Sequence, residues 1–507
     1  MDNYATLASM NTIILTTLNS RFTHTSIALR YLYANMQELQ ENAKIVEFSI
    51  NDAVQTIAEK ILIHNPCIIG IGVYIWNASE VRELIHILKK VSPKTKIILG
   101  GPEVSHEPFR VNFDNADFII QGEGDKAFYN LCKDILNKKS TPRVIKMSMP
   151  SLKEIALPYR YYSDDDIKNR YIYVEASRGC PFECEFCLSS MDEKVRAFDI
   201  EMLLEEFELL WARGARNFKF IDRTFNLNIK TAITLLDFFL KKEPPYFAHF
   251  EVVPDHFPEA LKEKIALFPS GALQLEIGIQ TLNPEIANNI SRPLKFDKIK
   301  ENITFLEEKT NAHMHLDLIV ALPGETLQSF GANLDTLVAL SGCEIQIGIL
   351  KKLSGTAINR HDIEHKMVYS DIPPYDVLQT STLSFNDIQT MKRFSRFWDL
   401  FYNSGNFKES VKLLWQNESV FKNFYDFSLW IYTQTDSTWQ ISLQRLCELL
   451  FNYLVGAKKQ DEKRVAQSML NDIMKYQGRN APAFLKPYID TNSTKEKIII
   501  QHFHKRG

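Results

Sequence analysis

The sequence predicts an α/β protein with three parts: an N-terminal doubly wound parallel sheet, a central partial barrel of parallel strands, and a C-terminal α-helical domain. Three observations predict this fold. Strand-like apolar runs alternate with helix-period segments in two series, a stretch rich in proline, serine and charge separates the series, and the strand-like runs end near residue 370. A chain of 507 residues also exceeds what one hydrophobic core usually serves.

The first series predicts a doubly wound domain over residues 1–140. Its five strand-like runs are 12–18, 44–50, 67–75, 96–101 and 116–122. The segments between them, such as "TSIALRYLYANMQEL", carry apolar residues at intervals typical of amphipathic helices. Doubly wound sheets bind ligands beyond the carboxyl ends of their strands. Glycines lie at these ends, as Gly70 and Gly72, Gly100 and Gly101, and Gly122 and Gly124. Each glycine either lets the backbone approach a ligand or serves an ordinary turn.

The second series predicts a partial barrel over residues 169–370, after a linker at 141–168 in which proline, serine and charged residues interrupt the apolar pattern. Its six strand-like runs are 171–176, 217–222, 247–253, 273–280, 313–321 and 344–350. Six units are too few to close an eightfold barrel but follow its logic. Catalytic groups are therefore expected at the C-terminal ends of these strands.

The last part, residues 371–507, is expected to be helical. "MKRFSRFWDLFYNSG" and "ISLQRLCELLFNYLVG" have helical periodicity, and one face of the first carries Phe394, Phe397, Trp398 and Phe401. Such a face is expected to be buried.

Composition favours a cytoplasmic protein. The formal net charge of −3 gives no electrostatic argument for nucleic acid or membrane, and no uninterrupted apolar stretch approaches the length of a bilayer span. The first residues, "MDNYATLASM", lack the basic start of a signal peptide. In a reducing compartment, clustered cysteines suggest metal binding or catalysis rather than disulfides.

Three of the seven cysteines form such a cluster, as Cys180, Cys184 and Cys187, just after the first barrel strand. Three soft thiolates can hold three irons of a cubic iron-sulfur cluster and leave the fourth iron open to a small molecule. The alternative is structural zinc, which needs four ligands, usually as two separated pairs, and the sequence has no second pair. The remaining cysteines are expected to be small buried hydrophobes: Cys67, Cys132, Cys343 and Cys447.

The cysteine spacing, preceded by "SRG" and followed by "LSS", resembles the signature of radical S-adenosylmethionine (radical SAM) enzymes. The resemblance implies a 4Fe-4S cluster on the three cysteines. It also implies that S-adenosylmethionine binds the open iron and is cleaved reductively to a 5′-deoxyadenosyl radical. An electron donor such as flavodoxin or ferredoxin is then expected.

The same resemblance implies residues that contact S-adenosylmethionine. Phe186 is similar to an aromatic residue that packs on adenine, and Asp222 and Thr224 in "FIDRTFN" resemble groups that receive the methionine amine. For each, a core position or a turn at the barrel end is the alternative.

Further candidates lie at the ends of later strands. Glu276 and Gln280 point the same way on an extended chain, and relatives use such residues for the ribose or the carboxylate. Arg292 resembles a partner for the methionine carboxylate, and Pro323 and Gly324 in "DLIVALPGET" resemble the turn beside adenosine. Surface ion pairs and ordinary turns are the alternatives.

The N-terminal domain resembles the Rossmann-like, cobalamin-binding class of radical SAM enzymes through "RFTHTSIALRYLYANM", "GVYIWNASEV", "LGGPEVS" and "QGEGDKAF". The helical part resembles an uncharacterised domain appended to one branch of that class. The resemblance places these residues around the corrin and its tail, with turns and core packing as alternatives: Tyr74, Trp76, Gly100, Gly101, Glu103, Gly122 and Glu123. The Asp-x-His-x-x-Gly motif that supplies a cobalt ligand in other cobalamin domains does not occur, and His24 in the corresponding loop has different flanks.

The leading hypothesis is a radical SAM enzyme that transfers a methyl group from cobalamin to an unactivated carbon of a small molecule, peptide or nucleic acid. The alternatives are radical rearrangement, cyclisation or oxidation without methyl transfer, and a non-catalytic zinc- or cobalamin-binding regulatory module. A methylthiotransferase is disfavoured because only Cys67 and Cys132 lie in the first domain, too few for a second cluster. Iron with acid-labile sulfide would support the enzyme, and stoichiometric zinc the module.

Overall fold

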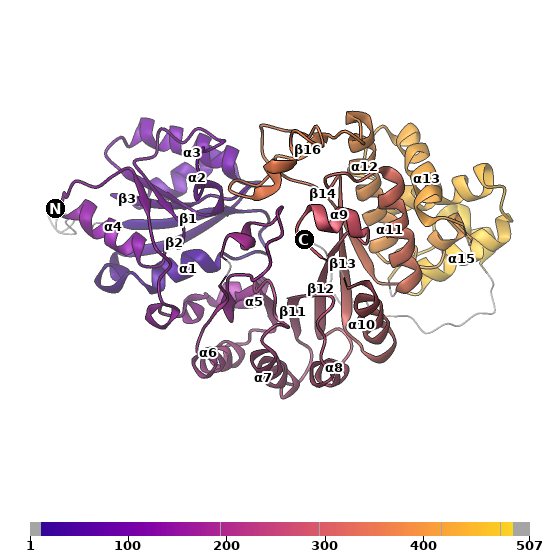
Figure 1. The fold of residues 1–507 in the computed structure, drawn as a ribbon, viewed down its shortest axis with the longest axis horizontal. Coiled ribbons are helices and arrows are strands. Elements are labelled where there is room, and N and C mark those ends of the chain that lie inside the picture. The colour runs from indigo at the N-terminus through magenta and orange to yellow at the C-terminus, as the bar shows by residue number, and fades with distance from the viewer. Residues whose placement is uncertain (1–11, 193, 294, 417, 477, 490–507) are drawn as a thin grey trace, which may run out of the picture.

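The computed structural model describes residues 12–192, 194–293, 295–416, 418–476 and 478–489. The N-terminal sheet domain lies at one end of the molecule, the barrel in the middle, and the C-terminal helices at the other end (Figure 1). Among these residues, every helix is too short or too polar to cross a bilayer.

The first domain is a parallel sheet with helices on both faces. The strands, in the order β2-β1-β3-β4-β5-β6, are β1 (Ile13–Asn19), β2 (Ala43–Ser49), β3 (Ile68–Gly72), β4 (Lys96–Gly100), β5 (Phe118–Gln121) and β6 (Val144–Lys146). Helices α1 (Ile27–Ala34) and α4 (Ala127–Leu136) cover one face, and α2 (Val54–Leu62) and α3 (Ala78–Val91) cover the other. Strand order reverses between β1 and β3, which is where a doubly wound sheet binds ligands.

All five predicted strands of this domain are present, but the segment predicted as a linker is more structured than expected. Its β6 pairs with β5, and it also contains η3 (Leu152–Glu154), η4 (Tyr159–Tyr161) and α5 (Asp164–Asn169). A strand of three residues is too short to show a period, so the pattern could not reveal it.

The middle of the chain forms the expected partial barrel. Its strands, in the order β14-β13-β12-β11-β10-β7, are β7 (Ile172–Val174), β10 (Asn217–Phe220), β11 (Phe247–Val252), β12 (Leu273–Gln280), β13 (His313–Val320) and β14 (Glu344–Ile349). The helices around them are α6 (Ile200–Ala212), α7 (Ile229–Leu240), α8 (Glu259–Ala266), α9 (Pro284–Asn289), α10 (Phe296–Lys309) and α11 (Leu327–Leu340). β7 and β14 are the two edges of the sheet, so the barrel is open.

The barrel interior is polar. Along β12, Leu273, Leu275, Ile277 and Ile279 are buried, while the alternate positions Gln274, Glu276, Gly278 and Gln280 are half-buried. Because alternate residues of a strand face opposite sides, the apolar set packs under the helices and the polar set faces inward. Closed barrels usually fill this space with branched apolar side chains. The open interior here is instead available for polar chemistry.

The C-terminal region is helical and shares the core of the barrel. Its elements are α12 (Phe385–Trp398), η7 (Asp399–Asn403), η8 (Val411–Leu414), α13 (Val420–Thr435), α14 (Leu443–Asn452), η9 (Tyr453–Ala457), α15 (Glu462–Met474) and η10 (Ala483–Tyr488). The predicted aromatic face of α12 and η7 is buried, with Phe394, Phe397, Trp398 and Phe401 each at 0% exposure. These side chains belong to one hydrophobic cluster that continues into the barrel. Residues 490–507 of the predicted helical domain lie outside the described residues.

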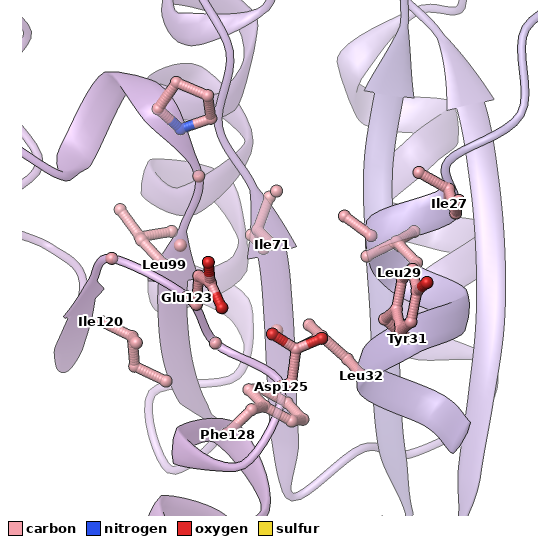
Figure 2. Close-up of a pocket in the computed structure, with 18 of the residues that line it drawn as sticks. Ile27, Leu29, Tyr31, Leu32, Ile71, Leu99, Ile120, Glu123, Asp125 and Phe128 are labelled. Carbon is pink, nitrogen blue, oxygen red and sulfur yellow. The ribbon is translucent and has the colours of Figure 1, made fainter. Parts of the chain in front are cut away.

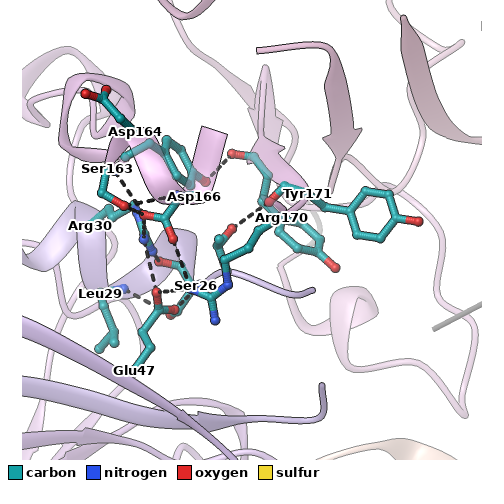
Figure 3. A network of polar contacts seen from close by, with 12 residues as sticks. Ser26, Leu29, Arg30, Glu47, Ser163, Asp164, Asp166, Arg170 and Tyr171 are labelled. Carbon is teal, nitrogen blue, oxygen red and sulfur yellow. Dashed lines mark hydrogen bonds and ion pairs between the residues drawn. The ribbon is translucent and has the colours of Figure 1, made fainter. Parts of the chain in front are cut away.

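A buried ion-pair network joins the first domain to the barrel (Figure 3). Arg30 of α1 donates to Glu47 of β2 at 3.0 Å and to Asp166 of α5 at 2.7 Å, and Arg170 donates to the same two carboxylates. All four side chains are 8% exposed or less. Buried charges are tolerated only when they are paired, so this network fixes α5, and with it the start of β7, against the first sheet.

Candidate functional site

The three clustered cysteines lie on the loop that connects two short antiparallel strands, β8 (Ser177–Arg178) and β9 (Arg196–Ala197). Gly179 starts the loop with a φ of +95°, and a Cβ there would lie 2.4 Å from the Lys194 carbonyl oxygen. Only glycine fits this backbone. The Cys180 backbone N–H donates to the Asp192 carbonyl at 2.8 Å, which closes the loop behind the first cysteine.

Cys180, Cys184 and Cys187 all line one cavity of about 190 Å³ at the C-terminal ends of the barrel strands. Arg292 donates to the Cys184 sulfur at 3.2 Å. Among the described residues, no three His, Cys, Asp or Glu side chains converge closely enough to hold a single metal ion. The thiolates of a cubic cluster bind separate irons and therefore lie farther apart. Three soft donors around one cavity fit such a cluster.

Five of the predicted cofactor residues line this same cavity: Phe186, Thr224, Glu276, Gln280 and Arg292. Burial disfavours ionisation of Glu276, but its 2.9 Å hydrogen bond with His249 and the nearby positive charges outweigh burial and lower its pKa. The site therefore presents a carboxylate and a guanidinium near the cysteines.

Three other predicted residues lie outside the cavity lining. Asp222 accepts from the Ala176 N–H at 2.9 Å and from the Ser177 hydroxyl at 2.6 Å, and burial raises its pKa to about 6. The Pro323 carbonyl accepts from Asn289, and Gly324, with a φ of +87°, lies against the His365 ring. Asp222 thus orients the strand before the cluster loop, and Pro323 and Gly324 belong to the turn after β13.

The sequence reasoning missed Asp317, whose side chain also lines the cavity. Its Oδ1 is buried without a hydrogen-bond partner, and burial, together with the charges of Glu276 and Glu251, raises its pKa well above the usual value. The signal was present, because His313, His315 and Asp317 alternate with buried apolar residues on β13. Deeper in the barrel, a polar chamber of about 810 Å³ shares Glu276 with the cysteine cavity.

A second cavity, of about 320 Å³, lies at the carboxyl ends of β3, β4 and β5 and has a mainly apolar lining (Figure 2). Two glycines of the wall have close neighbours. A Cβ on Gly70 would lie 2.5 Å from the Phe128 ring, and Gly101 has a φ of +110° with the Val73 carbonyl oxygen 2.5 Å from a notional Cβ. A side chain at Gly101 would therefore displace the Val73 backbone, and one at Gly70 would displace the Phe128 ring, which also lines the cavity.

Five of the seven residues predicted around a corrin line this cavity: Tyr74, Gly100, Gly101, Gly122 and Glu123. The other two do not. Trp76 stacks on Tyr74 at 4.5 Å and donates to the Leu18 carbonyl, and Glu103 accepts from the hydroxyl of Tyr375. Among the described residues of the lining there is no histidine, and His24 instead lies 2.5 Å from the Tyr173 hydroxyl.

The short segment after β7 contributes residues to both cavities, because Cys180 lines the first cavity. Glu175 and Arg178 line the second cavity, and Arg178 is two residues before Cys180. Arg178 donates to Glu123 at 3.0 Å, to Asp125 at 2.9 and 3.1 Å, and to Glu175 at 3.0 and 2.9 Å. Burial raises the pKa of Glu175 to about 7. Arg178 thus joins the loop after β5 in the first domain, which contains Glu123 and Asp125, to the strand that precedes the cysteine loop.

Comparison with known families divides the chain into three matches. Residues 13–132 match the B12 binding domain, residues 174–337 match the radical SAM superfamily, and residues 363–505 match a protein of unknown function, DUF4080.

Among curated proteins, the chain is 24% identical over 373 residues to the uncharacterized methyltransferase PH0819 of Pyrococcus horikoshii, covering 68% of this chain and 79% of that protein. It is 22% identical to the cobalamin-dependent radical SAM methyltransferase TokK of Streptomyces tokunonensis, over 59% of this chain and 49% of TokK. It is 25% identical to the ribosomal protein uS12 methylthiotransferase RimO of Synechocystis, over 56% of this chain and 64% of RimO.

Solved structures show the same fold. The radical S-adenosylmethionine methyltransferase TsrM from Kitasatospora setae, with cobalamin and a 4Fe-4S cluster bound, aligns with a TM-score of 0.59 at 16% identity over 74% of this chain and 79% of TsrM. The cobalamin-dependent S-adenosylmethionine radical enzyme OxsB aligns with a TM-score of 0.60 at 14% identity, over 91% of this chain and 78% of OxsB.

Proposed function

We propose that this chain is a cobalamin-dependent radical SAM methyltransferase that methylates an unactivated carbon of its substrate. Its three parts match a B12-binding domain, a radical SAM domain and DUF4080. The family matches imply a 4Fe-4S cluster, S-adenosylmethionine and cobalamin as cofactors. Methyl transfer to carbon, and the residues that hold each cofactor, are our proposal.

One observation carries the proposal: residues 175–187 line both the glycine-lined cavity, through Glu175 and Arg178, and the cysteine-lined cavity, and Arg178 binds this segment to Asp125 of the first domain. In this assignment Cys180, Cys184 and Cys187 bind the cluster. Arg292, Thr224 and Gln280 supply hydrogen bonds for S-adenosylmethionine, and the Phe186 ring covers its base. When bound, the cluster and S-adenosylmethionine supply hydrogen abstraction, and cobalamin supplies the methyl group.

The chain's own residues provide placement and exclusion of water. Glycines of the lining, such as Gly100 and Gly122, let a flat ligand approach the backbone, and apolar residues of the wall keep water away from it. The buried carboxyl of Asp317 faces the cysteine cavity from the barrel interior, where it offers a hydrogen bond to substrate. A methylthiotransferase is not favoured, because the first 140 residues contain only Cys67 and Cys132.

The test is anaerobic reconstitution with iron, sulfide and cobalamin, followed by dithionite and S-adenosylmethionine carrying a deuterated methyl group. We expect 5′-deoxyadenosine from the wild-type protein and none from a triple Cys180, Cys184 and Cys187 to Ala variant. Cys343→Ala, which removes a half-buried cysteine outside the cavity, is the matched control and should behave like wild type.

Absence of 5′-deoxyadenosine from protein that holds its iron and sulfide would overturn the radical assignment. With a substrate extract added, a product that carries no deuterium would overturn methyl transfer and favour rearrangement, cyclisation or oxidation.

A further inference from the structure

Glu185, which lies between Cys184 and Phe186, is only 4% exposed and is not among the residues that line the cysteine cavity. Its carboxylate accepts from the Ser291 hydroxyl at 2.6 Å and lies 2.9 Å from the His361 Nε2 atom. The Arg360 guanidinium forms an ion pair with it at 2.5 Å. A buried carboxylate is costly unless it is paired, and this one has three partners from outside its own loop.

Two of these partners belong to a segment that links the barrel to the helices, residues 351–383, here called the strap. Arg360 and His361 end its helical turn η6 (Ala357–His361), and its hairpin strands are β15 (Val368–Tyr369) and β16 (Val377–Gln379). The strap follows β14 and precedes α12, and it runs above the barrel in Figure 1.

The strap also contacts the turn after β13 and the first domain. The Thr382 hydroxyl donates to the Glu325 carbonyl at 2.5 Å, in the turn after β13. The Tyr375 hydroxyl donates to Glu103 in the first domain, and the Arg110 guanidinium lies 4.4 Å from the centre of the Tyr375 ring. One segment therefore connects the cysteine loop, the turn after β13 and the first domain.

The cysteine loop itself has an exposed half and an anchored half. Pro181, Phe182 and Glu183 are exposed, whereas Cys184 and Glu185 are buried. The Glu185 backbone N–H donates to the Ile290 carbonyl at 3.2 Å, so both its main chain and its side chain hold this point of the loop. Cys184 and Phe186 are its direct neighbours, so their positions depend on this anchor.

We propose that Glu185 is a positioning residue for the cluster: together with His361 and Arg360 of the strap, it holds Cys184, Phe186 and Cys187 in place before and after the cluster binds. This inference rests on the proposed function and gives the segment before the C-terminal helices a task that no family match assigns.

The test compares full-length Glu185→Gln with Glu183→Gln, an exposed carboxylate two positions earlier in the same loop. In cluster-free protein, amide hydrogen exchange in peptides covering residues 177–192 should be faster in Glu185→Gln and unchanged in Glu183→Gln. After reconstitution, a ferrous-iron chelator should strip iron from Glu185→Gln about tenfold faster, the size of effect typical when a group supporting a metal ligand is lost. The electron paramagnetic resonance signal of the reduced cluster should change in the same variant.

His361→Asn removes the other partner of the same contact. It should also increase the rate of amide exchange in the cysteine loop and the rate of iron loss. The double variant should be no worse than the worse single variant, because both changes remove one interaction. If Glu185→Gln does not fold, His361→Asn alone decides the question by the same two readouts.

Wild-type exchange and wild-type iron loss in Glu185→Gln would overturn the positioning role. If the wild-type protein itself takes up no iron and sulfide, the proposed function fails, while the exchange comparison in cluster-free protein still decides whether Glu185 anchors the loop.

Discussion

Single residues define the two cavities more sharply than the motifs alone suggest. Gly101 and Gly179 occupy backbone conformations that other residues rarely adopt, and each has a carbonyl oxygen where a Cβ would be. From the sequence, Gly101 was a candidate for close approach to a ligand, but an ordinary turn was the favoured explanation. Only the position of Val73 across the turn decides that a side chain has no room there.

Gly101→Ala should weaken corrin binding and stability together. Its φ of +110° and the close Val73 carbonyl force the loop to move, at a cost of about 1–3 kcal/mol. Gly456→Ala is the control, because nothing lies within 4 Å of its notional Cβ. Corrin absorbance retained after desalting is the measurement. Equal retention in Gly101→Ala and wild type would contradict the placement of the ligand.

Because of Glu175, the free energy of unfolding should fall as pH rises. Burial lifts its pKa from 4.5 to about 7, so the folded protein binds a proton more tightly than the unfolded chain does between these values. Its stabilising effect is therefore complete below about pH 4.5 and is lost as pH rises through about 7. Glu175→Gln should flatten this part of the curve of unfolding free energy against pH, measured by denaturant titration. An unchanged slope would contradict the burial of a protonated carboxyl at this position.

At the scale of elements, the period-two and period-3.6 patterns predicted the strands and helices that carry a strong alternation. Each of the eleven strand-like runs corresponds to a strand of the two sheets. β6 was missed because "VIK" is too short to show a period, and it is recognised only by its pairing with β5. The polar face of β12 was visible in the alternation of "LQLEIGIQ".

The ion-pair network between α1, β2 and α5 should be strongly stabilising. Arg30→Met leaves Glu47 and Asp166 in a buried site with one guanidinium fewer, and we expect a loss of about 3 kcal/mol in unfolding free energy. Lys133→Met is the control, because its ion pair with Glu38 is exposed at 51% and 56%, so its loss should leave the midpoint close to that of the wild type. The midpoint of guanidinium unfolding measures both. Equal midpoints would show that α5 is not held by this network.

For the whole molecule, the sequence predicted which parts are present but not how they meet. The cysteine loop, the glycine-rich turns and the barrel order all follow from local patterns. Glu103 was expected to be a corrin contact, yet it accepts a hydrogen bond from Tyr375, 272 residues later in the chain. Local patterns show which residues share a face of a strand, but they do not identify the partner that approaches from elsewhere. The link from Arg178 to Asp125 and the strap contacts to Glu185 are of this kind.

The proposed function depends on three thiolates that hold a cluster with one open iron near a corrin site. The most direct measurement is the electron paramagnetic resonance spectrum of anaerobically reconstituted, reduced protein, recorded before and after S-adenosylmethionine is added. We expect a 4Fe-4S signal whose g values shift on addition, and loss of that signal in the triple cysteine variant. A cluster signal that S-adenosylmethionine leaves unchanged, or the same signal without the three cysteines, would contradict a three-thiolate cluster with an open iron.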